Sequence, residues 1–177
     1  MKTKLTFILA TMVLLGGCSL IKDAATVTID TDLTSSVTVT VAGAKSAGLT
    51  ANGDLPFSVS MDLRLDENTD IEPYLEKIRK IGLSSIVVTV SGLPSNQVIS
   101  TISLDVTGVG NICTQTNVTA VNNTFTPVVS QETFDKVATK LTNDLKITYT
   151  IHGYVALPGT FVISTIWGAE VTAGALD

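Results

Sequence analysis

The chain has 177 residues, and its 16 acidic and 11 basic side chains give a formal net charge of −5. Because an acidic surface repels phosphate groups and no basic cluster interrupts it, this composition argues against nucleic acid as a partner. A single histidine excludes metal sites that need several histidines, and two cysteines are too few for a disulfide framework.

The first residues carry a targeting pattern. Lys2 and Lys4 flank the start of an apolar run, Leu5 to Leu15, which is shorter than the roughly 20 apolar residues that a membrane-spanning helix needs. The run ends in Leu15-Gly16-Gly17-Cys18. This segment resembles the signal peptide of bacterial lipoproteins, in which a short lipobox of small residues precedes a cysteine.

The resemblance implies how the protein is processed and held. Residues 1–17 would be removed as the signal peptide, and Cys18 would become the first mature residue and carry acyl chains. Residues 18–25 would then form a tether. Ser19 rather than aspartate follows Cys18, which in many such proteins goes with delivery to the outer membrane. The resemblance therefore implies a lipid-anchored protein of the bacterial cell envelope.

Processing would change the charge and the thiol content of the chain. Loss of Lys2 and Lys4 leaves the mature protein more acidic, so anionic lipids would not attract it and membrane attachment would depend on the lipid at Cys18. With Cys18 lipidated, Cys113 has no intramolecular partner. Its flanking residues supply no cation to lower its pKa, so we expect a buried, inert thiol rather than a reactive one.

The first half of the expected domain is rich in threonine and valine, which favour strands. Apolar and polar residues alternate from Val27 to Val41, with Leu33–Ser36 interpreted either as a turn between two strands or as a bulge in one. Phe57–Leu65 is the clearest strand, with alternate apolar residues on one face. Two further strands, Ser84–Val90 and Ile99–Thr107, are predicted to pair as a hairpin.

Two segments have helical periodicity. Ile71, Leu75, Ile78 and Ile81 form an apolar stripe, which predicts a helix that begins near Thr69 or Asp70 and ends at Gly82. A second helix is predicted from Gln131 to Leu145. Ser130 is its expected N-cap, and its apolar stripe contains Phe134, Val137, Leu141 and Leu145.

The remaining segments are predicted to be strands and turns. One strand is expected within the polar region before the second helix, at Asn117–Val121. After that helix, Ile147–Val155 and Phe161–Trp167 are separated by Leu157-Pro158-Gly159, which fits a tight turn. This pattern predicts a second long hairpin at the end of the chain.

Asp66–Glu72 begins like a calcium-binding loop, with acidic or amide side chains at alternate positions. The comparison fails further on, because Ile71 stands where such a loop needs glycine and Lys77 where it needs a bidentate glutamate. The expected role of these polar residues is to end a strand and cap a helix. We predict no metal and no cofactor.

Other candidate residues also favour structural roles. His152 falls on a polar strand face, and no serine lies in a G-x-S-x-G elbow that could make it part of a hydrolase triad. Aromatic side chains could stack on sugars but more often fill a core; those near the C-terminus are Tyr149, Tyr154, Phe161 and Trp167. The sequence therefore predicts no enzyme.

These patterns together predict one β-rich domain, residues 26–177, of the α+β class. We expect an antiparallel sheet or a two-layer β-sandwich with two amphipathic helices packed on it. Two functions remain open at this point. The first is a non-catalytic binding or structural module with a protein or glycan partner, and the second is a carrier of a lipid or other apolar ligand, which would need an internal cavity.

Overall fold

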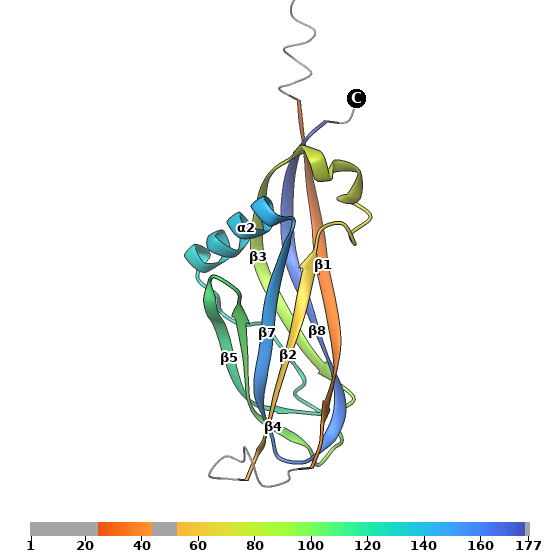
Figure 1. The fold of residues 1–177 in the computed structure, drawn as a ribbon, viewed down its shortest axis with the longest axis vertical. Helices are drawn as coiled ribbons and strands as arrows, with labels where there is room; N and C mark the ends of the chain where they lie inside the picture. Colours follow the sequence, from red (N-terminus) through yellow and green to blue (C-terminus); the bar gives the residue numbers. More distant parts are fainter. Residues whose placement is uncertain (1–24, 44–52, 176–177) are drawn as a thin grey trace, which may run out of the picture.

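The computed structural model describes residues 25–43 and 53–175. Eight antiparallel strands form two four-stranded sheets packed face to face (Figure 1). One sheet has the order β1 (Thr26–Val41), β8 (Gly159–Gly174), β3 (Ile78–Ser91), β6 (Thr124–Phe125). The other has the order β2 (Leu55–Arg64), β7 (Lys146–Val155), β4 (Val98–Val106), β5 (Gly110–Thr119). This strand order is that of a jelly roll, and it confirms the predicted two-layer β-sandwich.

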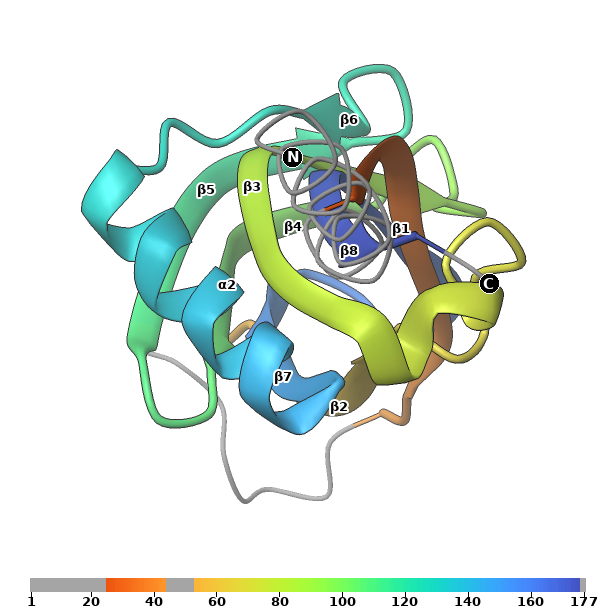
Figure 2. The ribbon, with the colours of Figure 1, turned by 90° about the horizontal axis from the view of Figure 1, so that it is seen from above.

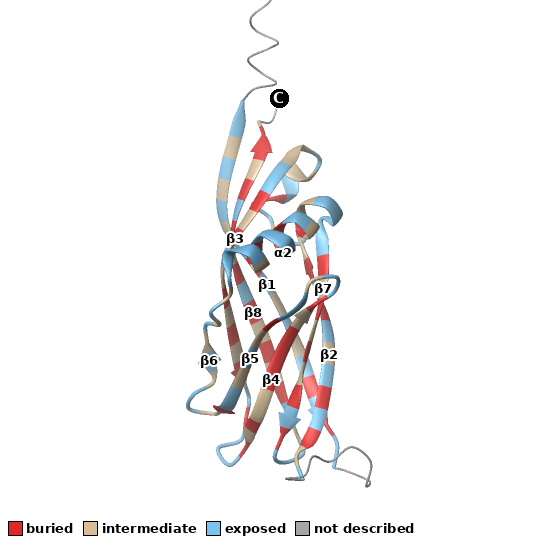
Figure 3. Cartoon of the chain, turned by 90° about the vertical axis from the view of Figure 1, so that its left-hand side faces the viewer, coloured by how far each residue is buried: buried red, intermediate tan, exposed pale blue. Residues whose placement is uncertain are grey.

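The two longest strands of the first sheet are β1 and β8, which have 16 residues each. They pair without a register shift, from Thr26 opposite Gly174 to Val41 opposite Gly159. The predicted turn or bulge at Leu33–Ser36 is therefore wrong. Leu33 is only 1% exposed, because exposed and less exposed residues continue to alternate through this segment, as the burial colours along the strands in Figure 3 illustrate.

The core lies between the two sheets and is closed mainly by branched aliphatic and aromatic side chains. Its largest fully buried members include Trp167, Tyr149 and Phe161. The Tyr149 and Trp167 rings meet edge to face at a centroid distance of 5.6 Å, and Phe57 and Phe161 at 5.4 Å. Such edge-to-face pairs add to the stability that burial of the rings provides.

The first predicted helix is wrong. Only a short 3-10 helix, η1 (Glu72–Lys77), forms, and Ile78 begins strand β3. Its start has no side-chain cap; instead the Asn68 side-chain carbonyl accepts from the backbone N–H of Asp70 and Ile71. Gly82, the predicted helix end, lies inside β3. The apolar residues of this segment are compatible with a strand as well as with a helix. Pairing with β8 favours the strand.

The second predicted helix is confirmed as α2 (Gln131–Asp144). The Ser130 side chain accepts a hydrogen bond from the Thr133 backbone N–H, and Leu145 ends the helix in the left-handed conformation with φ of 56°. The side chains of Phe134, Val137 and Leu141 are buried. The helix contacts β3 of one sheet and β7 of the other, so it covers one side of the sandwich (Figure 2). The fold is therefore mainly β with one α-helix among the described residues.

Both predicted hairpins are wrong. β3 and β4 belong to different sheets, as do β7 and β8, so each connecting turn crosses the sandwich. Alternation shows which face of a strand is buried, but two strands can bury these faces against each other across the core instead of pairing edge to edge. The strand predicted at Asn117–Val121 is also displaced, because β5 runs from Gly110 to Thr119 and pairs with β4.

Candidate functional site

The predicted lipidation site, Cys18, and the signal peptide before it lie outside the described residues. Their roles remain predictions. The described chain begins just before Thr26, at the end of the sandwich where β8 finishes. Neither of the two helices in the described ranges is long and apolar enough to cross a membrane.

Cys113 lies on β5 and is intermediate in exposure rather than fully buried. It packs beside the core, and burial raises the pKa of its thiol to about 11. The nucleophilic thiolate is therefore scarce at neutral pH. This agrees with an unreactive thiol, although its side chain is less enclosed than we expected.

His152 lies on β7 and projects from the outer face of the second sheet. Its Nδ1 is 3.0 Å from Oδ2 of Asp105, and the two side chains are 45% and 35% exposed. His152 stands opposite Ser58 on β2 and Ser103 on β4. Ser103, however, is hydrogen-bonded to Thr114 at 2.9 Å. These residues form a polar row across the outer face of the sheet, in which His152 is partly exposed and Ser103 is buried.

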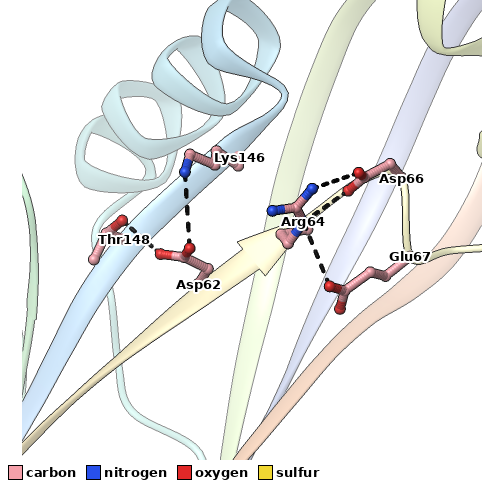
Figure 4. Close-up of polar contacts among 6 residues, drawn as sticks. All are labelled: Asp62, Arg64, Asp66, Glu67, Lys146 and Thr148. Carbon is pink, nitrogen blue, oxygen red and sulfur yellow. Dashed lines mark hydrogen bonds and ion pairs between the residues drawn. The ribbon is translucent and has the colours of Figure 1, made fainter.

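The acidic segment that follows β2 joins a surface charge cluster (Figure 4). The Arg64 guanidinium lies 2.6 Å from the Asp66 carboxylate and 3.4 Å from the Glu67 carboxylate. Asp62 accepts a hydrogen bond from Thr148 at 2.6 Å and lies 3.8 Å from Lys146. The surface charge cluster, Asp62, Arg64, Asp66, Glu67 and Lys146, contains three carboxylates and two basic groups, so one negative charge is unbalanced.

The ion pair between Arg64 and Asp66 shifts the pKa values of both groups. The hydrogen bond from Arg64 lowers the pKa of Asp66, and the same contact raises the pKa of Arg64. The Asp66 carboxylate is therefore paired with the Arg64 guanidinium. Within residues 25–43 and 53–175, no group of three or more His, Cys, Asp or Glu side chains could hold a metal ion.

The candidate site is a surface cleft of about 640 Å³ between the edge strands of the two sheets. The lining comes from β1, β2, β8 and the turn after β2: Thr34, Ser35, Ser36, Val37, Ser60, Met61, Asp62, Glu67, Ser164, Thr165 and Ile166. Hydroxyl groups dominate this lining, with two carboxylates at Asp62 and Glu67. Such a surface suits a polar partner better than an apolar ligand.

A hydroxyl network lies at the inner side of this cleft. Ser35 of β1 and Thr165 of β8 both line the cleft and both contact the Tyr149 hydroxyl of β7. Trp167 donates from Nε1 to the Thr165 hydroxyl at 3.2 Å. The network links the two sheets across the core. Burial raises the pKa of Tyr149, although hydrogen bonds from its neighbours oppose this change.

The aromatic side chains that might have stacked on a sugar are mostly in the core. Tyr149, Phe161 and Trp167 are buried, as the core interpretation predicts. Tyr154 differs, because it is 38% exposed on the outer face of the second sheet. None of the aromatic rings described in the structure lines the cleft.

Sequence reasoning missed the residues that build the cleft. The sequence pattern predicts a turn or a bulge at Leu33–Ser36, which includes three of the lining residues of β1, and it assigns no functional role to Thr165. A signal was present nevertheless: Thr34–Val41 contains neither charge nor proline, which is unusual for a strand at the edge of a sheet.

No protein-family model matches the sequence, and no curated protein matches it. Among solved structures, the chain is similar to the decameric BFDV capsid protein, with 11% identity, a TM-score of 0.46, and coverage of 84% of this chain and 99% of that one. It is also similar to a chain of the semi-empty virus-like particle of the giant freshwater prawn Macrobrachium rosenbergii nodavirus, with 11% identity, a TM-score of 0.43, and coverage of 85% of this chain and 97% of that one. The Drosophila NLP core, a pentamer that binds histones, has 12% identity, a TM-score of 0.30, and coverage of 83% and 100%.

Proposed function

We propose that this protein is a bacterial lipoprotein of the outer membrane, anchored through acyl chains on Cys18, whose β-sandwich is a non-catalytic binding module. The observation that supports the anchor is the sequence Leu15-Gly16-Gly17-Cys18 directly after a short apolar run. The observation that supports a binding role is the hydroxyl-lined cleft between β1 and β2. The partner is a protein or a glycan in or near the cell envelope.

The position of the cleft fits this arrangement. β1 begins at Thr26, one residue after the proposed tether, and Thr34 at the cleft is eight positions further along the same strand. At roughly 3.3 Å per residue, the cleft is about 25 Å from the tethered end. An anchor at Cys18 would therefore leave the cleft free of the bilayer surface.

The alternative function, a carrier of an apolar ligand, finds less support. A carrier needs an apolar cavity in which most of the ligand is buried. The clefts described in the structure are open and lined by hydroxyl and charged groups, including Glu132, Lys136 and Lys140 of α2. An environment-sensitive apolar dye should therefore give no saturable signal with the folded protein, and one-to-one binding of such a dye would favour the carrier.

Labelling tests the anchor. Cells that express the wild-type chain should incorporate radioactive palmitate into a processed product that fractionates with the outer membrane. Cys18→Ser should abolish the label and leave the precursor, whereas the matched variant Cys113→Ser should label normally. Normal labelling of Cys18→Ser would overturn the lipoprotein proposal.

A further inference from the structure

The four sheet edges of this sandwich differ in how they are protected. Natural proteins prevent unwanted strand pairing with short edge strands, bulges, proline or charge. β6 is two residues long. β5 has a register shift against β4 and a left-handed residue at Asn117. β2 contains Pro56 and carries Asp62 and Arg64. β1 is the longest of the described edge strands and has no bulge, and its residues 33–41 contain neither charge nor proline.

The half of β1 nearest the N-terminus is nevertheless covered. Asn68, in the turn after β2, donates from its side chain to the backbone carbonyl of Asp32 and to the Thr31 hydroxyl, both at 3.1 Å. Asp30 and Asp32 add charge to this half. These features prevent a second strand from pairing there.

The other half of the edge has free backbone groups. The Ala25 carbonyl accepts from Ala175, on the β8 side, whereas the Asp32 carbonyl points away from β8 toward Asn68. Because pairing directions alternate along an antiparallel strand, the N–H and C=O groups of Thr34 and Ser36 also point away from β8. No backbone hydrogen bond within the described ranges joins β1 to β2.

The cleft lies directly beside these free groups. Four consecutive residues of β1, Thr34–Val37, line it. Alternate side chains point to opposite faces of a sheet, so a cleft lined by all four includes the edge of the strand, and Ser164, Thr165 and Ile166 of β8 extend the lining beyond that edge. Ser60 and Asp62 of β2 form the facing wall, and that wall also belongs to the unpaired edge of its sheet.

We propose that an extended, positively charged polypeptide segment binds in this cleft by adding as a strand to β1 at Thr34–Val37. The free backbone groups of Thr34 and Ser36 supply the pairing. The carboxylates of Asp62 and Glu67, within a cluster of net negative charge, attract basic side chains of the segment. This partner class rests on the proposed function of the β-sandwich as a binding module.

The test uses the full-length Cys18→Ser chain in detergent, so that its outcome does not depend on lipidation. The probe is a fluorescent peptide of about eight residues, long enough to span the cleft, with alternating threonine and valine and a lysine at each end. We expect saturable, one-to-one binding by fluorescence anisotropy that weakens as salt rises. The control peptide has the same side chains but methylated amides on its pairing edge, and it should bind at least about tenfold more weakly.

Variants of the edge locate the binding. Ser36→Pro removes a backbone donor that faces the cleft but leaves the ladder with β8 intact, and it should weaken the peptide at least about tenfold. Thr28→Pro makes the same change on the same edge outside the cleft and should alter affinity less than about twofold. Ser36→Lys, which keeps the backbone donor, should weaken the peptide by charge repulsion, and Glu67→Gln should reduce the salt dependence.

The remaining outcomes all count against the proposal. No binding of the peptide, or equal binding of the methylated peptide, would overturn strand addition. Equal effects of Ser36→Pro and Thr28→Pro would overturn the location. A concentration-dependent dimer that Ser36→Lys dissociates would make a second copy of the chain the occupant instead. Palmitate labelling of Cys18 is unaffected by each of these results, so the anchor and the strand site can fail separately.

Discussion

Two groups of polar side chains flank the cleft, and they differ in almost every physical respect. The hydroxyl network of Ser35, Tyr149 and Thr165 is neutral, largely buried and shared between both sheets. The surface charge cluster around Arg64 is ionic and exposed. A buried polar group without a partner is costly, whereas an exposed ion pair is screened by water and salt. The comparison indicates that the network stabilises the sandwich, while the cluster mainly sets the local charge.

Loss of the Thr165 hydroxyl should have the largest effect. Thr165→Val keeps the shape of the side chain but removes the oxygen that Tyr149, Trp167 and Ser35 share. The buried Trp167 N–H then loses its Thr165 acceptor. We expect the free energy of unfolding to fall by about 2–3 kcal/mol, measured by urea denaturation of the Cys18→Ser chain.

The matched control is Thr160→Val, the same substitution on the same strand. Thr160 is exposed and its hydroxyl contacts only Thr40, at 3.2 Å, among the described side chains. This variant should change the unfolding free energy by no more than about 0.5 kcal/mol. Equal effects of the two substitutions would show that the buried network has no special role in stability.

The next effect, that of the Tyr149 hydroxyl, should depend on pH. Because burial raises the pKa of Tyr149 above 10.0, the unfolded chain releases this proton first as pH rises. The contribution of Tyr149 to stability is therefore complete below pH 10 and declines above it. Tyr149→Phe should lower stability at pH 7 by about 1 kcal/mol and should flatten the alkaline decline in the melting temperature. An unchanged alkaline slope would show that Tyr149 does not cause it.

The surface cluster should give the smallest effect. Asp66→Asn removes the strongest ion pair of Arg64, yet the melting temperature at pH 7 should change by less than about 2 °C. The pKa of Asp66 is lowered in the folded state, so any contribution is present above its unfolded value of 3.8 and disappears as pH falls below it. A large loss of stability at pH 7 would remove the distinction between cluster and network.

Much of the fold could be predicted because the alternation of apolar and polar residues shows which face of each strand is buried. Alternation located β1, β2 and β7, and the agreement of stripe, N-cap and length located α2. The neighbours of each strand could not be predicted in this way. The apolar face of β3 is the same whether β4 pairs with it or packs against it across the core. The local sequence therefore cannot distinguish a hairpin from a crossing between the two sheets.

The segment Ile71–Gly82 shows a second limit. Its apolar residues match helical spacing, but Ile78 and Ile81 are also β-branched residues beside a long strand that needs a partner. Twelve residues of β3 pair with β8 in a hydrogen-bonded ladder, and a short isolated helix cannot compete with this. The cleft was missed for a related reason, since its walls meet only when residues 34–37 and 60–62 are brought together.

The unbroken pairing of β1 with β8 also has a mechanical consequence. A pull through residues before Thr26, as the proposed anchor on Cys18 would apply it, acts along the axis of β1. A partner strand held at Thr34–Val37 would resist from the opposite direction. The tension would then run along β1 and load its hydrogen bonds to the partner strand together, as shear, while the continuous pairing with β8 from Thr26 to Val41 keeps β1 within the sandwich. The same edge that offers a binding site would make the domain a stiff link under tension.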